Sequence, residues 1–478
     1  MPVPIITVAQ MRTWEQATWA AGHTETAVIA RVGEVVARRA MQLTRGGERV
    51  LILAGKGHNG DDARQAEPHL TGREVELIDV IDPQQALTPV LAALQKRPAL
   101  IIDGLFGIGL NRSLDAHWYQ LLLRVNEAQR PVLAVDNPSG LNAETGEIAG
   151  TALRATITLT LGAPKRGLLA PSALPIVGRL EVAAHIGLVP CPCQSDWQWT
   201  LPEDFAAFPP PRPVAGHKGT FGHLAIIAGS MGYHGAAVLA ARGAQRARPG
   251  LITLLPQENV YGPIASQLQA VMVHPWESGT SLENFSAILI GPGLASPDVP
   301  LAIRNLLNRL WVYSERPIIV DASALDWLAP TAHVREKSVR VITPHPGEAA
   351  RLLQCRAADV QADRPKAVRE LSRQFGDCWV VLKGHQTLVG HAEGELFVNS
   401  SGNPDLAQGG SGDVLAGYLA GWLAQPDLET DATTVIRFAV WQHGASADDL
   451  AQERRNWVVD DLVERLGDGG KPKPEHSA

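Results

Sequence analysis

Short apolar runs rich in β-branched residues alternate with helical patterns along both halves of the chain. In the first half, the segment Trp118 to Ala128 has apolar residues at helical spacing. The strands expected in this half are Val50 to Leu53, Leu100 to Asp103, Val132 to Asp136 and Thr156 to Leu161. This alternation predicts a parallel sheet flanked by helices, the α/β class.

The second half repeats the pattern. Its expected strands are Leu224 to Ala228, Leu251 to Leu255, Ile288 to Ile290, Ile318 to Asp321, Val341 to Thr343 and Trp379 to Lys383. Several of the runs end in Gly, Asp, His or Lys, and open α/β sheets bind ligands beyond the carboxyl ends of their strands. Polar residues at those ends are therefore site candidates in both halves.

A proline-rich segment separates the two halves. Between residues 189 and 216, prolines remove backbone donors and fix φ, so neither a helix nor a central strand is expected there. We predict domains at residues 1–190 and 216–478, joined by a linker at residues 191–215. Cys191 and Cys193 have no second cysteine pair at zinc-site spacing, and we interpret them as linker thiols.

Composition narrows the class of function. The 478 residues are 45% apolar, enough for the cores of two or three domains, and the net charge of −7 comes without a basic tract. No apolar run reaches the roughly 18 residues that a membrane span needs, and the first residues lack a secretory-signal pattern. We expect a cytoplasmic homo-oligomer that acts on small molecules, with neither nucleic acid nor membrane as a partner.

Residues 407–421, AQGGSGDVLAGYLAG, place glycines and an aspartate before a helical pattern. The glycines let main-chain N–H groups approach an anion, and the helix directs the positive end of its dipole at the same place. Asp413 would repel a phosphate, but it suits a base that takes a proton from a hydroxyl nucleophile. The alternative is an aspartate that only stabilises the helix dipole, by about 0.3 to 1 kcal/mol.

Five further motifs precede this loop: HKGTFG, GAAVLAA, GPGL, TPHPGEAARLL and LKGHQT. In this order, residues 216 to 466 resemble the dehydratase of NAD(P)H-hydrate repair, which has a ribokinase-like α/β fold. The resemblance implies ADP with Mg²⁺, the S epimer of NADHX or NADPHX as substrate, and Asp413 as the catalytic base. It assigns nucleotide binding to Lys383, Gly384, His385, Gln386, Thr387 and Gly412, and hydrate binding to Ala237, Gly293, His345 and Asp413.

Three expected strand ends in the first half carry oxygen ligands. The loop GKGHNGDDA, with Asn59 and Asp62, follows the first strand. Asp103 ends the second strand, and Asp136 and Ser139 stand at the end of the third. Carboxylate, amide and hydroxyl oxygens suit a hard monovalent cation beside an acid/base group. The alternative is a set of βα turns with polar filling.

Together with TLTLGAPKRGLL at residues 158–169, these segments resemble the NAD(P)H-hydrate epimerase, a Rossmann-like three-layer domain, over residues 7 to 188. The resemblance implies K⁺ on Asn59, Asp103 and Ser139, and acid/base catalysis by Asp136. It assigns hydrate binding to His58, Asn59, Gly60, Asp61, Asp62, Gly107, Ile108, Gly109 and Asp136.

The glycine loop departs from the family pattern GxGNNGGDG. His58, Asp61 and Ala63 replace Asn, Gly and Gly. At positions with positive φ, the new side chains would cost about 1 to 2 kcal/mol, and the carboxylate of Asp61 would repel a phosphate. We therefore expect the epimerase to bind the hydrate poorly while the dehydratase works normally.

Two other functions fit parts of the sequence. A small-molecule kinase of the ribokinase superfamily would share the GxGD loop and its aspartate base, and it would release a phosphorylated product. The first half could also be a non-catalytic module that packs against or regulates the dehydratase.

Overall fold

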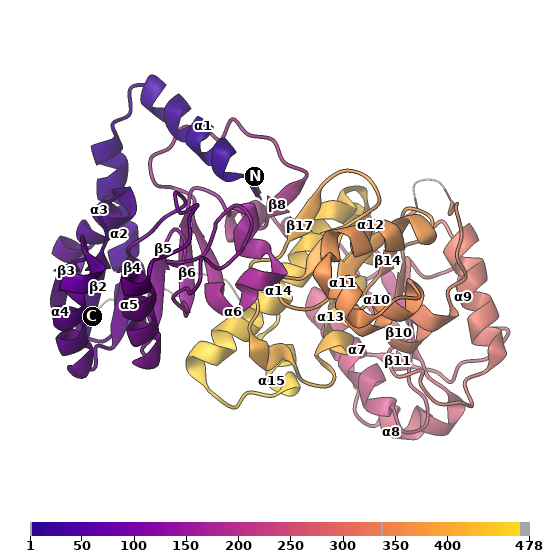
Figure 1. Cartoon of the computed structure of the whole chain (residues 1–478). Helices are drawn as coiled ribbons and strands as arrows, with labels where there is room; N and C mark the ends of the chain where they lie inside the picture. Colours follow the sequence, from indigo (N-terminus) through magenta and orange to yellow (C-terminus); the bar gives the residue numbers. More distant parts are fainter. Residues whose placement is uncertain (1, 336–337, 469–478) are drawn as a thin grey trace. The chain divides into compact units, whose positions relative to one another are not determined.

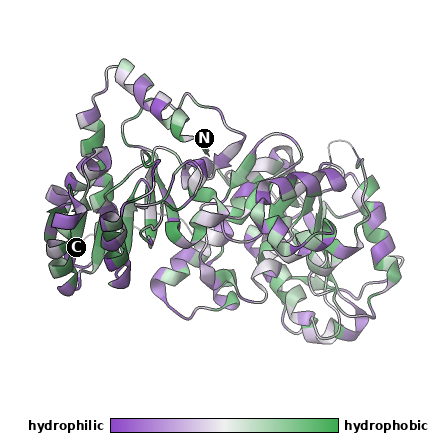
Figure 2. Ribbon diagram, viewed as in Figure 1, coloured by the Kyte–Doolittle hydropathy of each residue, from purple (hydrophilic) through white to green (hydrophobic). Residues whose placement is uncertain are grey.

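The computed structural model describes residues 2–335 and 338–468, which form two units, Val3–Ser195 and the segment from Asp196 onward. Each unit is built on a mainly parallel sheet with helices on its faces (Figure 1). The predicted α/β class is thus confirmed. Hydrophobic residues concentrate on the strands (Figure 2). No helix within the described ranges is both long and apolar enough to cross a membrane.

The first unit contains a parallel sheet of order β3-β2-β4-β5-β6-β7. Because β3 and β4 lie on opposite sides of β2, the strand order reverses at β2 and β4. Its strands are β1 (Val3–Pro4), outside this sheet, and β2 (Arg49–Ala54), β3 (Glu74–Asp79), β4 (Leu100–Gly104), β5 (Val132–Val135), β6 (Ile157–Leu161) and β7 (Arg179–Ala183). Its helices are α1 (Val8–Ala20), α2 (Glu25–Leu43), α3 (His58–Arg64), α4 (Pro83–Gln95), α5 (Ala116–Glu127) and α6 (Leu174–Val177).

Successive residues of β2 face two different cores. Val50 and Ile52 pack with the buried residues of α2, whereas Leu51 and Leu53 pack with those of α4 and α5. A strand that is buried on both faces reads as a continuous apolar run, as this one does. The unit therefore has three layers, with the sheet in the middle.

The second unit has the strand order β8-β17-β16-β15-β14-β13-β12-β9-β10-β11, in which only the pairs of β16 are antiparallel. Its strands are β8 (Trp197–Trp199), β9 (His223–Ile227), β10 (Leu251–Leu255), β11 (Met272–Val273), β12 (Ala287–Ile290), β13 (Ile318–Val320), β14 (Arg340–Ile342), β15 (Trp379–Leu382), β16 (Leu388–Gly390) and β17 (Leu396–Val398). Its helices are α7 (His234–Ala247), α8 (Tyr261–Ala265), α9 (Leu301–Tyr313), α10 (Pro346–Leu352), α11 (Ala357–Ala362), α12 (Arg364–Gln374), α13 (Ser411–Leu423), α14 (Ala432–Glu453) and α15 (Val459–Arg465).

The segment 191–215 is not a linker along its whole length. β8 lies inside it and pairs in parallel with β17, and Trp199 is buried. The strand is possible because Pro192 and Pro202 flank it and do not interrupt its three residues. The sequence pattern excluded only a helix or a central strand from this segment, and the structure places the short strand β8 there.

Glycines bring α7 and α13 into close contact. A Cβ added at Gly417 would lie 1.9 Å from the carbonyl oxygen of Ala240, and one added at Gly243 would lie 2.4 Å from that of Val414. Side chains at these positions would push the helices apart. This packing fixes the first turn of α13, which carries Gly412 and Asp413.

Candidate active sites

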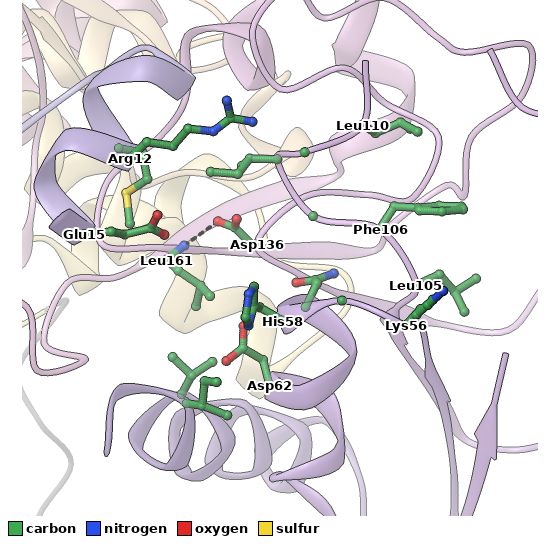
Figure 3. A pocket seen from close by; sticks show the side chains of 18 of the residues that line it. Arg12, Glu15, Lys56, His58, Asp62, Leu105, Phe106, Leu110, Asp136 and Leu161 are labelled. Atoms are coloured by element: carbon green, nitrogen blue, oxygen red, sulfur yellow. Dashed lines mark hydrogen bonds between the residues drawn. The ribbon is translucent and has the colours of Figure 1, made fainter. Parts of the chain in front are cut away.

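The first unit has a cavity of about 750 Å³ at the carboxyl ends of β2, β4 and β5 (Figure 3). Its wall includes seven of the residues expected for the hydrate site: His58, Asn59, Asp62, Gly107, Ile108, Gly109 and Asp136. Gly60 and Asp61 are not among its lining residues. Arg12 and Glu15 of α1 also line it, although no motif singled them out.

Asp136 follows β5 directly and has a left-handed φ of +63°. Its Oδ1 accepts hydrogen bonds from Lys165 Nζ at 2.5 Å, Leu161 N at 3.0 Å and Thr160 Oγ1 at 3.2 Å. Lys165 is fully buried, so its ammonium group compensates the charge of Asp136 inside the protein. The sequence did not indicate Lys165 as a site residue. The only indication in the sequence was its position between Pro164 and Arg166, a few residues after an apolar strand.

Asp103, near the end of β4, and Ser139, after β5, lie at the same edge of the sheet and are hydrogen-bonded to each other. Asp103 Oδ1 accepts from Ser139 Oγ at 2.6 Å, and its Oδ2 accepts from Ser139 N at 2.8 Å. Burial raises the pKa of Asp103 to about 6, although these hydrogen bonds oppose the rise. The carboxyl group is fully buried, and no cationic side chain pairs with it in the part of the chain that the structure describes.

Asn59 is the third of the residues expected to bind a cation. Its Oδ1 and Nδ2 are buried and, among the described residues, have no hydrogen-bond partner. A Cβ added at Gly104 would lie 2.8 Å from the carbonyl oxygen of Asn59, so α3 runs directly against the end of β4. A buried amide oxygen without a donor, near an uncompensated carboxyl group, fits the oxygen ligands of a hard cation.

The altered loop does not carry the strain that we expected. Positions 61 and 63 lie in α3 with helical backbone, not with positive φ, so Asp and Ala cost nothing there. The carboxylate of Asp61 is paired with Arg64 at 2.8 Å, and Asp61 lies outside the cavity wall. Ala63 is fully buried against Gly104. The reasons for expecting a weakened site were therefore wrong.

In the second unit, the carboxyl ends of β13, β14 and β15 meet the N-terminus of α13. Lys383 Nζ donates to Asp321 Oδ1 at 2.8 Å and lies 3.9 Å from Glu348 Oε2. A Cβ added at Gly412 would lie 3.3 Å from the same Nζ. The structure thus brings Lys383, Gly412 and Asp413 together with Asp321 and Glu348, which the sequence did not single out. Asp321 ended a predicted strand and Glu348 stood in the PHPGE motif, so both had a weak signal.

Asp413 is the third residue of α13. Burial raises its pKa to about 7, the carboxylates of Asp321 and Glu348 add to the rise, and Lys383 opposes it. Burial alone would lower the pKa of Lys383, but the same carboxylates outweigh this effect and raise it. The site therefore combines a permanent cation with a carboxyl group that changes charge near neutral pH, as a general base requires.

The LKGHQT motif includes the turn between β15 and β16, and Arg364 hydrogen-bonds to the backbone of this turn. Arg364 Nη2 donates to the carbonyl oxygen of Leu382 at 3.0 Å, and Nη1 donates to that of His385. Gly384 has φ +131°, and Gln386 has φ +51°. β15 and β16 thus form an antiparallel hairpin, but Lys383 at its turn is largely buried and paired with Asp321, so the lysine is not a solvated one. The hydrogen bonds from Arg364 help to hold the backbone of the turn in place.

Two further loops approach the same edge of the sheet. Gly293 has φ +66°, and a Cβ there would lie 2.3 Å from the carbonyl oxygen of Tyr233, next to the start of α7 with buried Ala237. His345 caps α10, where its Nδ1 accepts from Gly347 N at 3.0 Å, and its side chain is 54% exposed. A ligand could therefore reach the backbone at one loop and the imidazole at the other.

Known proteins resemble the chain along its length. A family model described as NAD(P)H-hydrate dehydratase matches residues 224–466, and one described as YjeF-related protein N-terminus matches residues 82–167. A bifunctional NAD(P)H-hydrate repair enzyme of Gloeobacter violaceus is 35% identical, over 97% of this chain and 96% of its own. One of Coxiella burnetii is 30% identical, over 96% and 97%. An ADP/ATP-dependent NAD(P)H-hydrate dehydratase of Bacillus subtilis, co-crystallised with ATP and Mg²⁺, is 32% identical with a TM-score of 0.50, covering 56% of this chain and 95% of that chain.

The buried pair of Lys165 and Asp136 gives a prediction about stability. Lys165→Met should lower the free energy of unfolding of the first unit by about 3 to 5 kcal/mol, because it leaves a buried carboxylate uncompensated. The double variant Lys165→Met, Asp136→Asn should recover much of this loss. Chemical denaturation of the purified proteins measures both. Additive losses in the double variant would contradict the pairing.

Proposed function

The chain belongs to the family of bifunctional NAD(P)H-hydrate repair enzymes, as its motifs predicted, and on this premise we propose that it restores hydrated NADH and NADPH to the active cofactors. The second unit dehydrates the S hydrate at the expense of ADP. The first unit interconverts the R and S hydrates. The observation that carries the proposal is Asp413, a carboxyl group with a pKa of about 7, at the N-terminus of α13 beside Lys383.

The dehydration needs a better leaving group than hydroxide. Asp413 takes the proton of the hydrate's hydroxyl group, whose oxygen then attacks the terminal phosphoryl group of ADP. Lys383 and the backbone N–H groups at Gly412 stabilise the charge on the phosphoryl oxygens. Phosphate then leaves, pushed by the lone pair of the ring nitrogen, and a proton leaves the neighbouring ring carbon to form the C=C bond of NAD(P)H, with AMP and phosphate as the other products.

Mg²⁺ would enter this site with the nucleotide, since the similar Bacillus subtilis dehydratase was co-crystallised with ATP and Mg²⁺. Among the described residues, no three His, Cys, Asp or Glu side chains are placed to hold a metal ion by themselves, so phosphate oxygens would supply part of its ligands. Bound with the nucleotide, Mg²⁺ neutralises phosphate charge. The LKGHQT turn supports nucleotide binding by its backbone groups and by the hydroxyl group of Thr387. Ala237, Gly293 and His345 would contact the hydrate on the other side.

In the first unit we propose K⁺ on Asn59, Asp103 and Ser139, and acid/base catalysis by Asp136. The orphaned amide of Asn59 and the buried carboxyl group of Asp103 support the ion. Bound there, the ion supplies a fixed positive charge close to the bound substrate. Asp136 stands at the cavity wall as a carboxylate held by Lys165, ready to accept a proton.

Product analysis tests the proposal. Purified S hydrate with the whole protein and ADP should recover the absorbance of the dihydronicotinamide and give one AMP and one phosphate per molecule. Without nucleotide the hydrate should persist. A phosphorylated product that accumulates would instead identify a small-molecule kinase.

Asp413→Asn should reduce the rate of this dehydration by about 10² to 10⁴, because Asn cannot accept the hydroxyl proton. Folding raises the pKa of Asp413, so its ionised form costs stability at neutral pH, and the variant should not unfold at a lower temperature. Asp405→Asn, at an exposed position of the preceding loop, is the matched control and should keep the wild-type rate. Full activity of Asp413→Asn would place the base elsewhere.

K⁺ should raise the unfolding midpoint of the first unit relative to choline at equal ionic strength. An ion that binds only the folded state adds about 2.7 kcal/mol at a hundredfold excess over its Kd. Thermal unfolding in the two salts measures the difference. Asp103→Asn should lose the K⁺-dependent shift, and Glu127→Gln, an exposed carboxyl group of α5, should retain it. A shift that survives in Asp103→Asn would overturn the assignment.

A further inference from the structure

Four carboxyl groups from different elements line the cavity of the first unit. Figure 3 labels Glu15 of α1, Asp62 of α3 and Asp136 after β5, and the fourth is Glu25 of α2. Their surroundings differ. Asp136 is paired with Lys165 at 2.5 Å. Asp62 is 7% exposed, and within the described ranges its carboxyl group has no hydrogen bond and no cationic partner. The proposed catalytic base is thus charge-compensated, while its neighbour on α3 is not.

The charges around Asp62 are mostly negative. Burial raises its pKa well above the usual range, and the carboxylates of Asp136, Asp61, Glu15 and Glu25 raise it further. Arg64, two residues farther along α3, does not compensate this charge, because it pairs with Asp61 and Asp79. The other charged or titratable groups of the cavity wall are Arg12, Glu15, Glu25, Lys56, His58 and Arg112. The surroundings of Asp62 therefore favour its protonated form, whereas Asp136 has a cationic partner in Lys165.

We propose that Asp62 is the proton donor that works opposite Asp136 in the interconversion of the R and S hydrates. Two titratable groups in one site whose surroundings favour opposite protonation states are suited to act as an acid and a base. Asp62 lines the cavity and is accessible to a ligand there. The inference rests on the proposed epimerase activity of this cavity.

The chemistry of the hydrate defines what the two groups do. Water adds to the enamine of the ring so that the hydroxyl group stands on the carbon next to the ring nitrogen. Asp136 takes the hydroxyl proton while the bond between this carbon and the nitrogen breaks and a C=O bond forms. Asp62 gives its proton to the nitrogen, which keeps the electron pair of the broken bond.

Rotation of the open chain presents the other face of the carbonyl group to the nitrogen. Asp62 then takes back the N–H proton as the nitrogen attacks the carbonyl carbon, and Asp136 returns its proton to the oxygen. The ring closes as the opposite epimer, and both carboxyl groups regain their starting states. No oxidant or further reactant is required.

The experiment starts from R hydrate without nucleotide and measures the appearance of S hydrate by chromatography, corrected for the spontaneous rate. We expect Asp62→Asn to lower kcat by about 10² to 10⁴ with little change in KM, because Asn cannot donate the proton. The wild-type kcat/KM should fall as the pH rises through the raised pKa of Asp62, because the group then loses its proton. This fall should be absent in Asp62→Asn and present in Asp62→Glu.

Asp79→Asn is the matched control, because it removes one exposed carboxylate that pairs with Arg64. It should keep both the rate and the pH profile, and the thermal midpoint of each variant reports the fold of the first unit. A wild-type rate in Asp62→Asn would overturn the inference. If Asp62→Asn is slow but its kcat/KM still falls as the pH rises, the inference is also overturned, and Glu15 becomes the next candidate for the proton donor. Failure of the wild-type protein to epimerise the R hydrate would instead reject the proposed function of the cavity.

Discussion

A buried lysine bound to a carboxylate at the carboxyl end of a parallel sheet organises both sites. In the first unit, Lys165 lies 2.5 Å from Asp136, and in the second unit Lys383 lies 2.8 Å from Asp321. Removing such charges from water is expensive, and only close pairing offsets the cost. The two pairs differ in one respect. Lys165 binds the proposed reacting carboxylate itself, whereas Lys383 binds a neighbour and leaves Asp413 able to change charge near neutral pH.

The backbone around the second pair has little freedom. Gly291 has φ +134°, and a Cβ there would lie 1.8 Å from the carbonyl oxygen of Asp321. Thr343 Oγ1 donates to Asp321 Oδ1 at 2.6 Å, the same oxygen that accepts from Lys383. The close approach of Gly291 and the hydrogen bonds from Thr343 and Lys383 thus hold Asp321 in place, and Asp321 in turn holds the lysine. The packing of α13 against α7 through their glycines positions the first turn of α13, and so places Asp413 near that lysine.

The sequence predicted ten strands because they are continuous apolar runs, and both ends of each agree with the structure to within one residue. β16 and β17 were not predicted because their apolar runs stand among polar residues and glycines, and β8 was not predicted because prolines surround it. Asp413, Lys383 and Asp136 stood out through their motifs. Lys165, Asp321 and Glu348 did not, because their importance comes from pairing between distant segments. The error at Asp61 and Ala63 has a similar origin, since a glycine pattern does not reveal whether a position has positive φ.

The pH dependence of kcat/KM for ADP-dependent dehydration of the S hydrate tests the central claim most directly. A base must be ionised to take the hydroxyl proton, and burial raises the pKa of Asp413 to about 7. The account therefore predicts that kcat/KM falls with the ionised fraction of this group as the pH drops below neutrality. A value of kcat/KM that stays constant from about one pH unit above to about two units below that pKa would contradict it.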